Sequence, residues 1–193
     1  MRIFGVILAG GQGRRMGGMD KALMPLCGRP LVSYVQDRLA PQVEDLALSA
    51  NGAAGRFAFT GLPVLPDHVS QGPLSGILAA LEWAEGADAV VSAAVDTPFL
   101  PCDLVPRLWL AGEGGLAVAE CGGRIHPVCA LWPRSLAPDL RAFLASGGAR
   151  MMEFCDRTGA ARAQFAPETP DPFLNINTPD DLALAEQAVR EGA

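Results

Sequence analysis

The sequence is short of basic charge and lacks paired cysteines, and each shortage excludes a class of protein. Lysine and arginine number 15 against 21 acidic residues, so the net charge is −6 and the pI is near 4.9. A broad basic face for nucleic acid is therefore not expected. The five cysteines are odd in number and contain no CxxC pair, which argues against a disulfide framework or a zinc site. Reduced thiols of this kind predict a cytoplasmic protein.

Long hydrophobic runs are also missing. No stretch approaches the roughly 18 apolar residues that a membrane helix needs. The apolar run near the N-terminus ends at Gly10-Gly11 and is followed by Arg14-Arg15, without a small-x-small cleavage site. We therefore expect neither export nor a membrane partner.

The chain contains one lysine, Lys21, while the other 14 basic residues are arginine. Lys21 closes a glycine-rich segment, residues 10–21, that directly follows the apolar run 3–9, which is typical of a buried strand. A lysine ammonium is a flexible point charge that fits among phosphate oxygens. The segment therefore predicts a phosphate site, although a chance lysine in a surface turn is the alternative.

Helical and strand patterns alternate along the 193 residues, half of which are hydrophobic. Strands are expected at 3–9, 46–49, 62–65, 87–95, 116–119 and 127–131, and helices at 30–39, 73–84, 136–145, 151–155 and from 179 onward. Gly122-Gly123 makes a hairpin possible between the last two strands. This order predicts one α/β domain of three layers, with a Rossmann-like, doubly wound, mostly parallel sheet and helices on both faces.

Polar residues follow several of these strands. The glycine loop follows the first strand, Ser49 and Asn51 follow the second, Asp67 the third and Asp96 the strand at 87–95. Ligands of open α/β sheets bind at the carboxyl ends of the strands. We therefore expect these segments to converge on one ligand site.

Two common phosphate loops do not fit the segment around Lys21. A Walker A loop ends in Gly-Lys-Ser/Thr, but Lys21 lies between Asp20 and Ala22. A dinucleotide fingerprint needs a third glycine where this chain has Met16. Ordinary P-loop NTPases and nicotinamide dehydrogenases are therefore excluded.

Five ordered blocks instead resemble those of nucleotidyltransferases, and specifically the molybdenum cofactor guanylyltransferases. The blocks are Leu8-Ala9-Gly10-Gly11 with Arg15-Met16-Gly17 and Lys21, then residues 71–77, 96–98, 126–131 and 175–179. Gly11 and the Gly-Pro-Leu-Ser-Gly run at 72–76 favour guanine over the cytosine of related enzymes. The resemblance implies a fold like that of nucleotide-diphospho-sugar transferases.

The resemblance also implies individual roles in nucleotide binding. The nucleotide would be bound by Leu8, Ala9, Gly10, Gly11, Lys21, Ser49, Asn51, Asp67, Gly76 and Asp96. Ser49 stands where relatives often carry asparagine, and Asn51 is a possible substitute for that contact. Asp67 would contact guanine or ribose, with a turn-forming role as the alternative.

The catalytic residues implied are Lys21, Arg15 and Asp96. Lys21 and Arg15 would bind phosphates, and Asp96 would bind Mg²⁺. A carboxylate at the end of a buried strand is costly unless it meets a cation, although capping of the following turn is the alternative.

Other positions would contact the acceptor. Asn175 and Asn177 would lie on the pterin side, with bracing of the turn before the last helix as an equal alternative. His126 resembles a position near the acceptor pocket, but it is also typical of a structural histidine.

The expected reaction transfers GMP from GTP to the terminal phosphate of molybdenum-bound molybdopterin and releases pyrophosphate, with Mg²⁺ as cofactor. Residues 1–100 would bind the nucleotide and 101–193 the acceptor. Transient contacts with molybdoenzymes or cofactor-delivery proteins are implied. The alternatives are a cytidylyl- or sugar-phosphate nucleotidyltransferase and a non-catalytic module that binds a nucleotide or cofactor.

Overall fold

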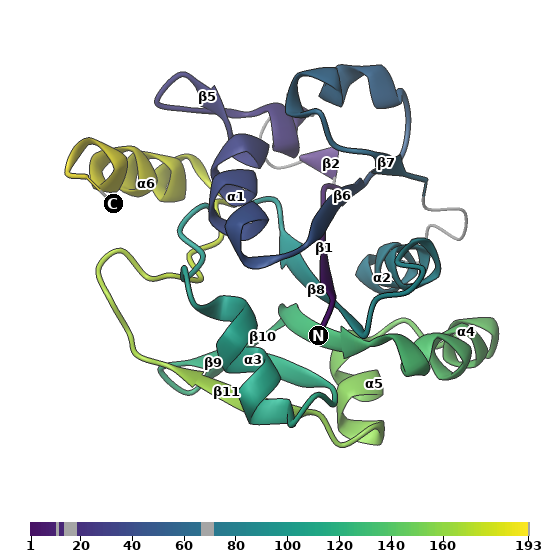
Figure 1. Cartoon of the computed structure of the whole chain (residues 1–193). Coiled ribbons are helices and arrows are strands. Elements are labelled where there is room, and N and C mark those ends of the chain that lie inside the picture. Colours follow the sequence, from purple (N-terminus) through teal and green to yellow (C-terminus); the bar gives the residue numbers. More distant parts are fainter. Residues whose placement is uncertain (11, 14–18, 67–71, 193) are drawn as a thin grey trace.

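The computed structural model describes residues 1–10, 12–13, 19–66 and 72–192. Within them a seven-stranded sheet forms the centre of the molecule (Figure 1). Its strands are β1 (Ile3–Leu8), β6 (Asp45–Ser49), β7 (Val64–Leu65), β8 (Ala89–Ala94), β9 (Ala117–Cys121), β10 (Arg124–Pro133) and β11 (Ala161–Phe165). Their spatial order is β11-β9-β10-β8-β1-β6-β7.

The sheet is mostly parallel, as predicted. β1 pairs in parallel with β6 on one side and β8 on the other, and β6–β7 and β9–β11 are parallel as well. β10 runs antiparallel to both of its neighbours, β8 and β9. The expected β9–β10 hairpin is confirmed, and its turn residues Gly122 and Gly123 have φ values of 57° and 79° that favour glycine.

Helices cover both faces of this sheet, which confirms the three-layer prediction. Two helices pack on one face: α1 (Leu31–Leu39) and α3 (Leu104–Gly112). Three pack on the other: α2 (Pro73–Trp83), α4 (Ala137–Ala145) and α5 (Met151–Arg157). The C-terminal helix α6 (Pro179–Arg190) lies beside α1 instead of on the sheet (Figure 1). Among the described residues, no helix has the length and apolarity to cross a membrane.

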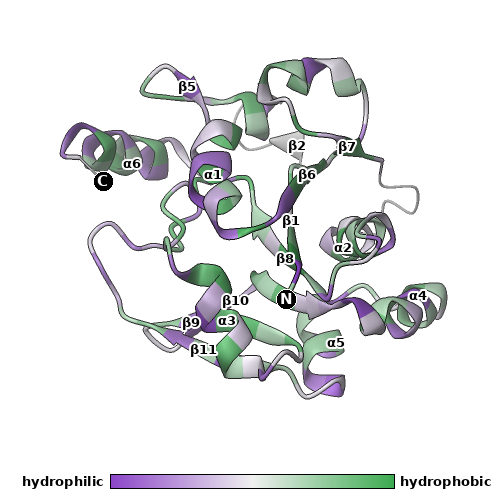
Figure 2. Ribbon diagram, viewed as in Figure 1, coloured by the Kyte–Doolittle hydropathy of each residue, from purple (hydrophilic) through white to green (hydrophobic). Residues whose placement is uncertain are grey.

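Alternation along β1 explains why two cores form. Ile3 and Ile7 are buried in the core under α1 and α3, whereas Phe4 and Val6 are buried in the core under α2, α4 and α5. Successive strand residues point to opposite faces, so a strand with both faces covered is a continuous apolar run. Figure 2 shows purple and green patches on α1 and α6, as expected for helices with one face in solvent.

Short elements connect these layers. They are the strand pairs β2 (Gln12–Gly13) with β3 (Met19–Asp20) and β4 (Pro25–Leu26) with β5 (Arg29–Pro30), and the 3₁₀ helices η2 (Lys21–Leu23), η3 (Ala40–Gln42), η4 (Ala54–Thr60) and η5 (Arg134–Leu136). The predicted start of the last helix is confirmed. Thr178 and Asp181 form a capping box in which each side chain accepts the other residue's backbone N–H.

Besides these short elements, two longer ones, α3 and β11, were not predicted from the sequence. Pro106 lies inside the first turn of α3, where a missing N–H is tolerated, so a proline that suggests a break does not produce one. β11 is an edge strand whose inward side is built from Ala163 and Phe165, with polar Arg162 and Gln164 between them. Such a weak apolar alternation is hard to distinguish from a loop.

Candidate functional site

The segments that follow the three parallel strands β1, β6 and β8 leave the sheet on the same side, at the carboxyl ends of the strands. The last residue of β1, Leu8, is in register with Ala94 of β8 and with Ser49 of β6. The segments that begin at Ala9, Val95 and Ala50 therefore leave the sheet side by side. The predicted convergence of these segments is confirmed for the described residues.

Lys21 reaches across the carboxyl ends of these strands. Its Nζ lies 2.5 Å from Oδ2 of Asp96 and 2.6 Å from Oδ1 of Asn177, which are 75 and 156 residues away along the chain. The side chains of Lys21 and Asp96 are only 15% and 16% exposed. Charges held this far from solvent interact more strongly than surface pairs. The structure thus brings together three of the predicted site residues.

Asp96 meets a cation, as its position after a buried strand requires. Its carboxylate contacts Lys21, and its backbone carbonyl accepts a hydrogen bond from the N–H of Ile176 at 3.0 Å. The second bond fixes the segment that carries Asn177 against the end of β8. The alternative that Asp96 only caps a turn is not favoured by these contacts.

Buried anchors hold the segment around Asn177. Phe173 and Ile176 are 1% and 0% exposed, and Asp181 accepts the N–H of Asn177 at 2.9 Å. This backbone hydrogen bond is the largest of the contributions that lower the pKa of Asp181. Asn177 is thereby aimed at Lys21 by the first turn of α6.

Asn175 behaves differently from Asn177. Its side-chain amide donates to the carbonyl of Phe173 at 3.1 Å, so it braces the local turn. This contact matches the structural alternative raised for Asn175. A contact with the acceptor stays a prediction.

Ser49 and Gly76 pack against each other between β6 and α2. A Cβ placed on Gly76 would lie 2.5 Å from Oγ of Ser49 and 3.0 Å from Cδ2 of Leu8. Ser49 itself is only 4% exposed. The geometry gives Gly76 a packing role, because it allows the helix to approach the strand closely. Their predicted nucleotide contacts are not tested by this arrangement.

Asn51, the possible substitute for Ser49, lies beyond the end of β6, and its predicted contact with the nucleotide stays a prediction. β6 ends at Ser49, and the chain turns at Gly52, whose φ is 84°. Asn51 is exposed next to this turn, where its backbone carbonyl accepts a hydrogen bond from Arg56 at 2.6 Å.

The first predicted nucleotide segment begins inside the sheet. Leu8 and Ala9 are 9% and 4% exposed, and the N–H of Ala9 donates to the carbonyl of Ser49 at 2.9 Å. Gly10 is exposed, and no described atom lies within 4 Å of a Cβ built on it. Its predicted contact with the nucleotide stays a prediction.

Three predicted site residues, Gly11, Arg15 and Asp67, lie outside the described residues.

Arg56 contacts the segment around Lys21 but was not predicted as a site residue. Its guanidinium binds Asp20, the neighbour of Lys21, with Nε 2.7 Å from Oδ2. The one hint of this role in the sequence is that Arg56 follows the predicted site residue Asn51 by five residues.

His126 lies within β10 and is 7% exposed. Its ring stacks on Phe173 with centroids 4.6 Å apart and planes at 22°. Burial lowers its pKa, as does Arg124, and Asp171 acts in the opposite direction. The ring therefore packs against an anchor of the Asn177 segment, which agrees with the structural alternative for this histidine.

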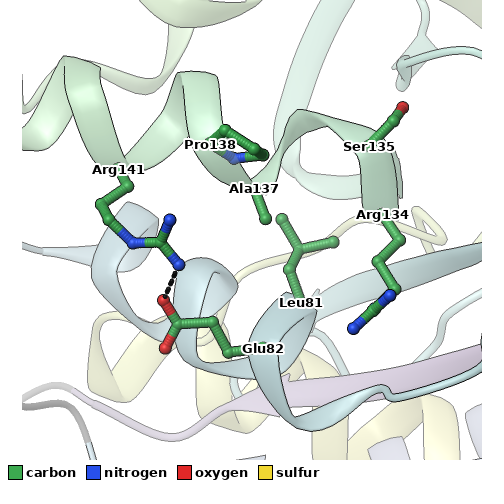
Figure 3. A pocket seen from close by; sticks show the side chains of 7 residues that line it. All are labelled: Leu81, Glu82, Arg134, Ser135, Ala137, Pro138 and Arg141. Carbon is green, nitrogen blue, oxygen red and sulfur yellow. Dashed lines mark hydrogen bonds and ion pairs between the residues drawn. The ribbon is translucent and has the colours of Figure 1, made fainter.

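A separate pocket lies near the amino end of β8, between the end of α2 and the start of α4 (Figure 3). Arg141 and Glu82 pair across it at 2.8 Å. Next to it, the backbone N–H of Arg134 donates to the carbonyl of Asp88, just before β8 begins. Asp96 follows the opposite end of β8, so this pocket is remote from the Lys21 site.

Comparisons with known proteins agree with this geometry. Residues 5–160 match the family model of the MobA-like NTP transferase domain. The chain is 64% identical to a molybdenum cofactor guanylyltransferase of Cereibacter sphaeroides and 52% identical to one of Rhodobacter capsulatus, each aligned over 100% of both chains. It also resembles the structure of molybdopterin-guanine dinucleotide biosynthesis protein A from Archaeoglobus fulgidus. That match has a TM-score of 0.77 at 25% identity and covers 97% of this chain and 99% of the other.

Proposed function

The chain belongs to the family of MobA-like NTP transferases, and we propose that it transfers GMP from GTP to the terminal phosphate of molybdenum-bound molybdopterin. The observation that carries the proposal is the cluster of Lys21, Asp96 and Asn177 at the carboxyl ends of β1 and β8. A partly buried ammonium next to a carboxylate suits a ligand that combines phosphates with a metal ion.

The reaction joins two phosphates. An oxygen of the molybdopterin phosphate attacks the α-phosphorus of GTP, a new P–O bond forms, and the bond to the β-phosphate oxygen breaks so that pyrophosphate leaves. The attacking phosphate is already an anion near neutral pH, so no side chain has to remove a proton from it. Alignment and charge neutralisation supply the catalysis.

Lys21 would neutralise the negative charge that builds up on the α-phosphate and on the leaving pyrophosphate. Asn177 accepts a hydrogen bond from its ammonium, which holds Lys21 at the carboxyl ends of the strands. Preorganised charges of this kind need no rearrangement during the reaction. Arg15 would be a second phosphate ligand.

Asp96 would hold Mg²⁺. The described residues contain no group of three or more His, Cys, Asp or Glu side chains able to enclose a metal. The carboxylate of Asp96, next to the proposed phosphate ligand Lys21, fits Mg²⁺, which commonly takes one or two carboxylates together with substrate phosphates. Bound there, Mg²⁺ would polarise phosphate oxygens as a Lewis acid.

Further parts of the proposal concern the rest of the molecule. Leu8, Ala9, Gly10 and Gly11 would contact the nucleotide, Asp67 would bind guanine or ribose, and Asn175 would face the acceptor. Residues 1–100 would form the nucleotide half and residues 101–193 the acceptor half. The enzyme would act in the cytoplasm and pass its product to molybdoenzymes or delivery proteins by transient contact.

Nucleotide competition tests this function against its rivals. Purified protein with Mg²⁺ and molybdopterin should release pyrophosphate with GTP and much less with CTP. Turnover with CTP and not with GTP would show a cytidylyltransferase. Binding of GTP without pyrophosphate release would show a non-catalytic module.

A further inference from the structure

We propose that Arg56 is a positioning residue. It would fix the Lys21 segment, residues 20–23, relative to the Asn51 segment, residues 50–53. The inference rests on the proposed nucleotidyl transfer, because both segments belong to the proposed nucleotide site. Arg56 itself would not contact the reacting atoms. It would act through Asp20 and through the backbone of the loop that follows β6.

The guanidinium of Arg56 binds acceptors from two separate parts of the chain. Nε donates to Oδ2 of Asp20 at 2.7 Å, one terminal nitrogen donates to the carbonyl of Asn51 at 2.6 Å, and the other donates to the carbonyl of Ala53 at 2.7 Å. A planar fork with five N–H donors can bridge three acceptors in this way, whereas a lysine ammonium cannot reproduce its geometry.

The guanidinium of Arg56 packs on a buried aromatic ring. Its guanidinium carbon lies 4.4 Å from the ring centroid of Phe57, which is fully buried in the core beneath α1. The side chains of Arg56 and Asp20 are 25% and 27% exposed, so solvent screens their pair less than a fully exposed one. The stacked, partly buried guanidinium can therefore act as a rigid connection.

Asp20 links Arg56 to the backbone at Lys21. While Oδ2 binds Arg56, Oδ1 accepts the N–H of Ala22 at 3.1 Å and caps the 3₁₀ turn η2, whose first residue is Lys21. Both carboxylate oxygens are thus used, one to reach Arg56 and one to shape the backbone at Lys21. A shift of Asp20 would move the base of the side chain that reaches Asp96.

The experiment measures GTP affinity and steady-state kinetics for Arg56→Ala, Arg56→Lys, Asp20→Asn and the double variant Asp20→Asn/Arg56→Ala. We expect Arg56→Ala to lower kcat/KM for GTP roughly tenfold or more, because small misplacements of positioned groups cost this much. KM for molybdopterin should change little. Arg56→Lys should recover only part of the loss, and the double variant should be no worse than Arg56→Ala.

Arg141→Ala is the matched control, since it also breaks a 2.8 Å arginine–carboxylate pair, but at the remote pocket (Figure 3). It should leave kcat and both KM values unchanged, and melting temperatures show whether each variant is folded. If the wild-type protein transfers no GMP, the proposed function fails. If the wild type is active and Arg56→Ala retains its kcat/KM and GTP affinity, or if the Asp20 and Arg56 effects multiply, the positioning role is wrong.

Discussion

The ammonium nitrogen of Lys21 lies 2.5 Å from a carboxylate oxygen of Asp96, so the chain's one lysine neutralises the acid that follows strand β8. The amide oxygen of Asn177 completes the contact at 2.6 Å. In this contact the two charges neutralise each other. In the proposed reaction Lys21 would contact phosphate and Asp96 would hold the metal ion.

Replacing Asp96 by alanine should nearly abolish turnover while the protein stays folded. The change removes the proposed metal ligand and leaves Lys21 without its carboxylate partner. We expect kcat to fall by about 10²-fold or more, the scale seen when a group that stabilises charge in a transition state is removed. Pyrophosphate release measures the rate, and circular dichroism checks the fold.

Asp37→Ala is a suitable control for this change, because it also removes a carboxylate that pairs with a cation, Arg29, but in an exposed surface pair. Its turnover should match the wild type. Comparable activity in Asp96→Ala would disprove the metal role of Asp96.

Lys21→Arg should also cause a large loss of turnover although it keeps the positive charge. The guanidinium is planar and wider than an ammonium, and the space between Asp96 and Asn177 holds a single nitrogen at 2.5 Å and 2.6 Å. The kinetics of this variant, compared with Lys21→Ala, separate charge from shape. Near-normal activity in Lys21→Arg would mean that any cation serves at this position.

Gly76→Ala should destabilise the fold. The new Cβ would lie 2.5 Å from Oγ of Ser49, and overpacking of this kind typically costs about 1–3 kcal/mol. The loss should be smaller in a Ser49→Ala background, where that oxygen is absent. Denaturant unfolding measures both effects.

Gly55→Ala is the matched control for Gly76→Ala, because no described atom lies within 4 Å of a Cβ built on Gly55. It should change the free energy of unfolding little. Equal losses for Gly76→Ala with and without the Ser49 hydroxyl would show that this contact is not the cause.

Asp181→Ala should lower the melting temperature in a pH-dependent way. Hydrogen bonds from the backbone of Asn177 and from Thr178 lower the pKa of Asp181 in the folded state. Its stabilisation is therefore complete above its unfolded pKa of about 3.9 and is lost as the pH falls through the folded-state value. The difference from the wild type should be constant between neutral and mildly acidic pH and shrink below about pH 4.

Asp180→Ala tests whether this effect belongs to the capping box, since Asp180 is an exposed acid in the same helical turn but not part of the box. It should cost less stability than Asp181→Ala at neutral pH. A loss in Asp181→Ala that is the same on both sides of pH 4 would contradict the account.

Much of the fold was predictable because local patterns agree with it. The apolar run of β1 and the capping residues Thr178 and Asp181 are signals that lie within a few residues of the element they specify. α3 and β11 were missed because Pro106 obscures one and the other depends on pairing with β9.

The convergence of Lys21 and Asp96 was predictable, because the segments that carry them follow strands that end on the same side of the sheet. Arg56 was not, because its partner Asp20 is 36 residues away and no local pattern records such a pair. Ser49 and Gly76 show a further limit. Resemblance placed them at the nucleotide, which stays a prediction, and the close approach of α2 to β6 is visible only in three dimensions.

GTP labelled at the α-phosphate tests the central claim most directly. With molybdopterin and Mg²⁺ present, we predict that the label appears in a molybdopterin guanine dinucleotide and that label placed at the β- or γ-phosphate leaves as pyrophosphate. Release of orthophosphate, or α-label recovered only as free GMP or unchanged GTP, would contradict the assignment of this site to GMP transfer.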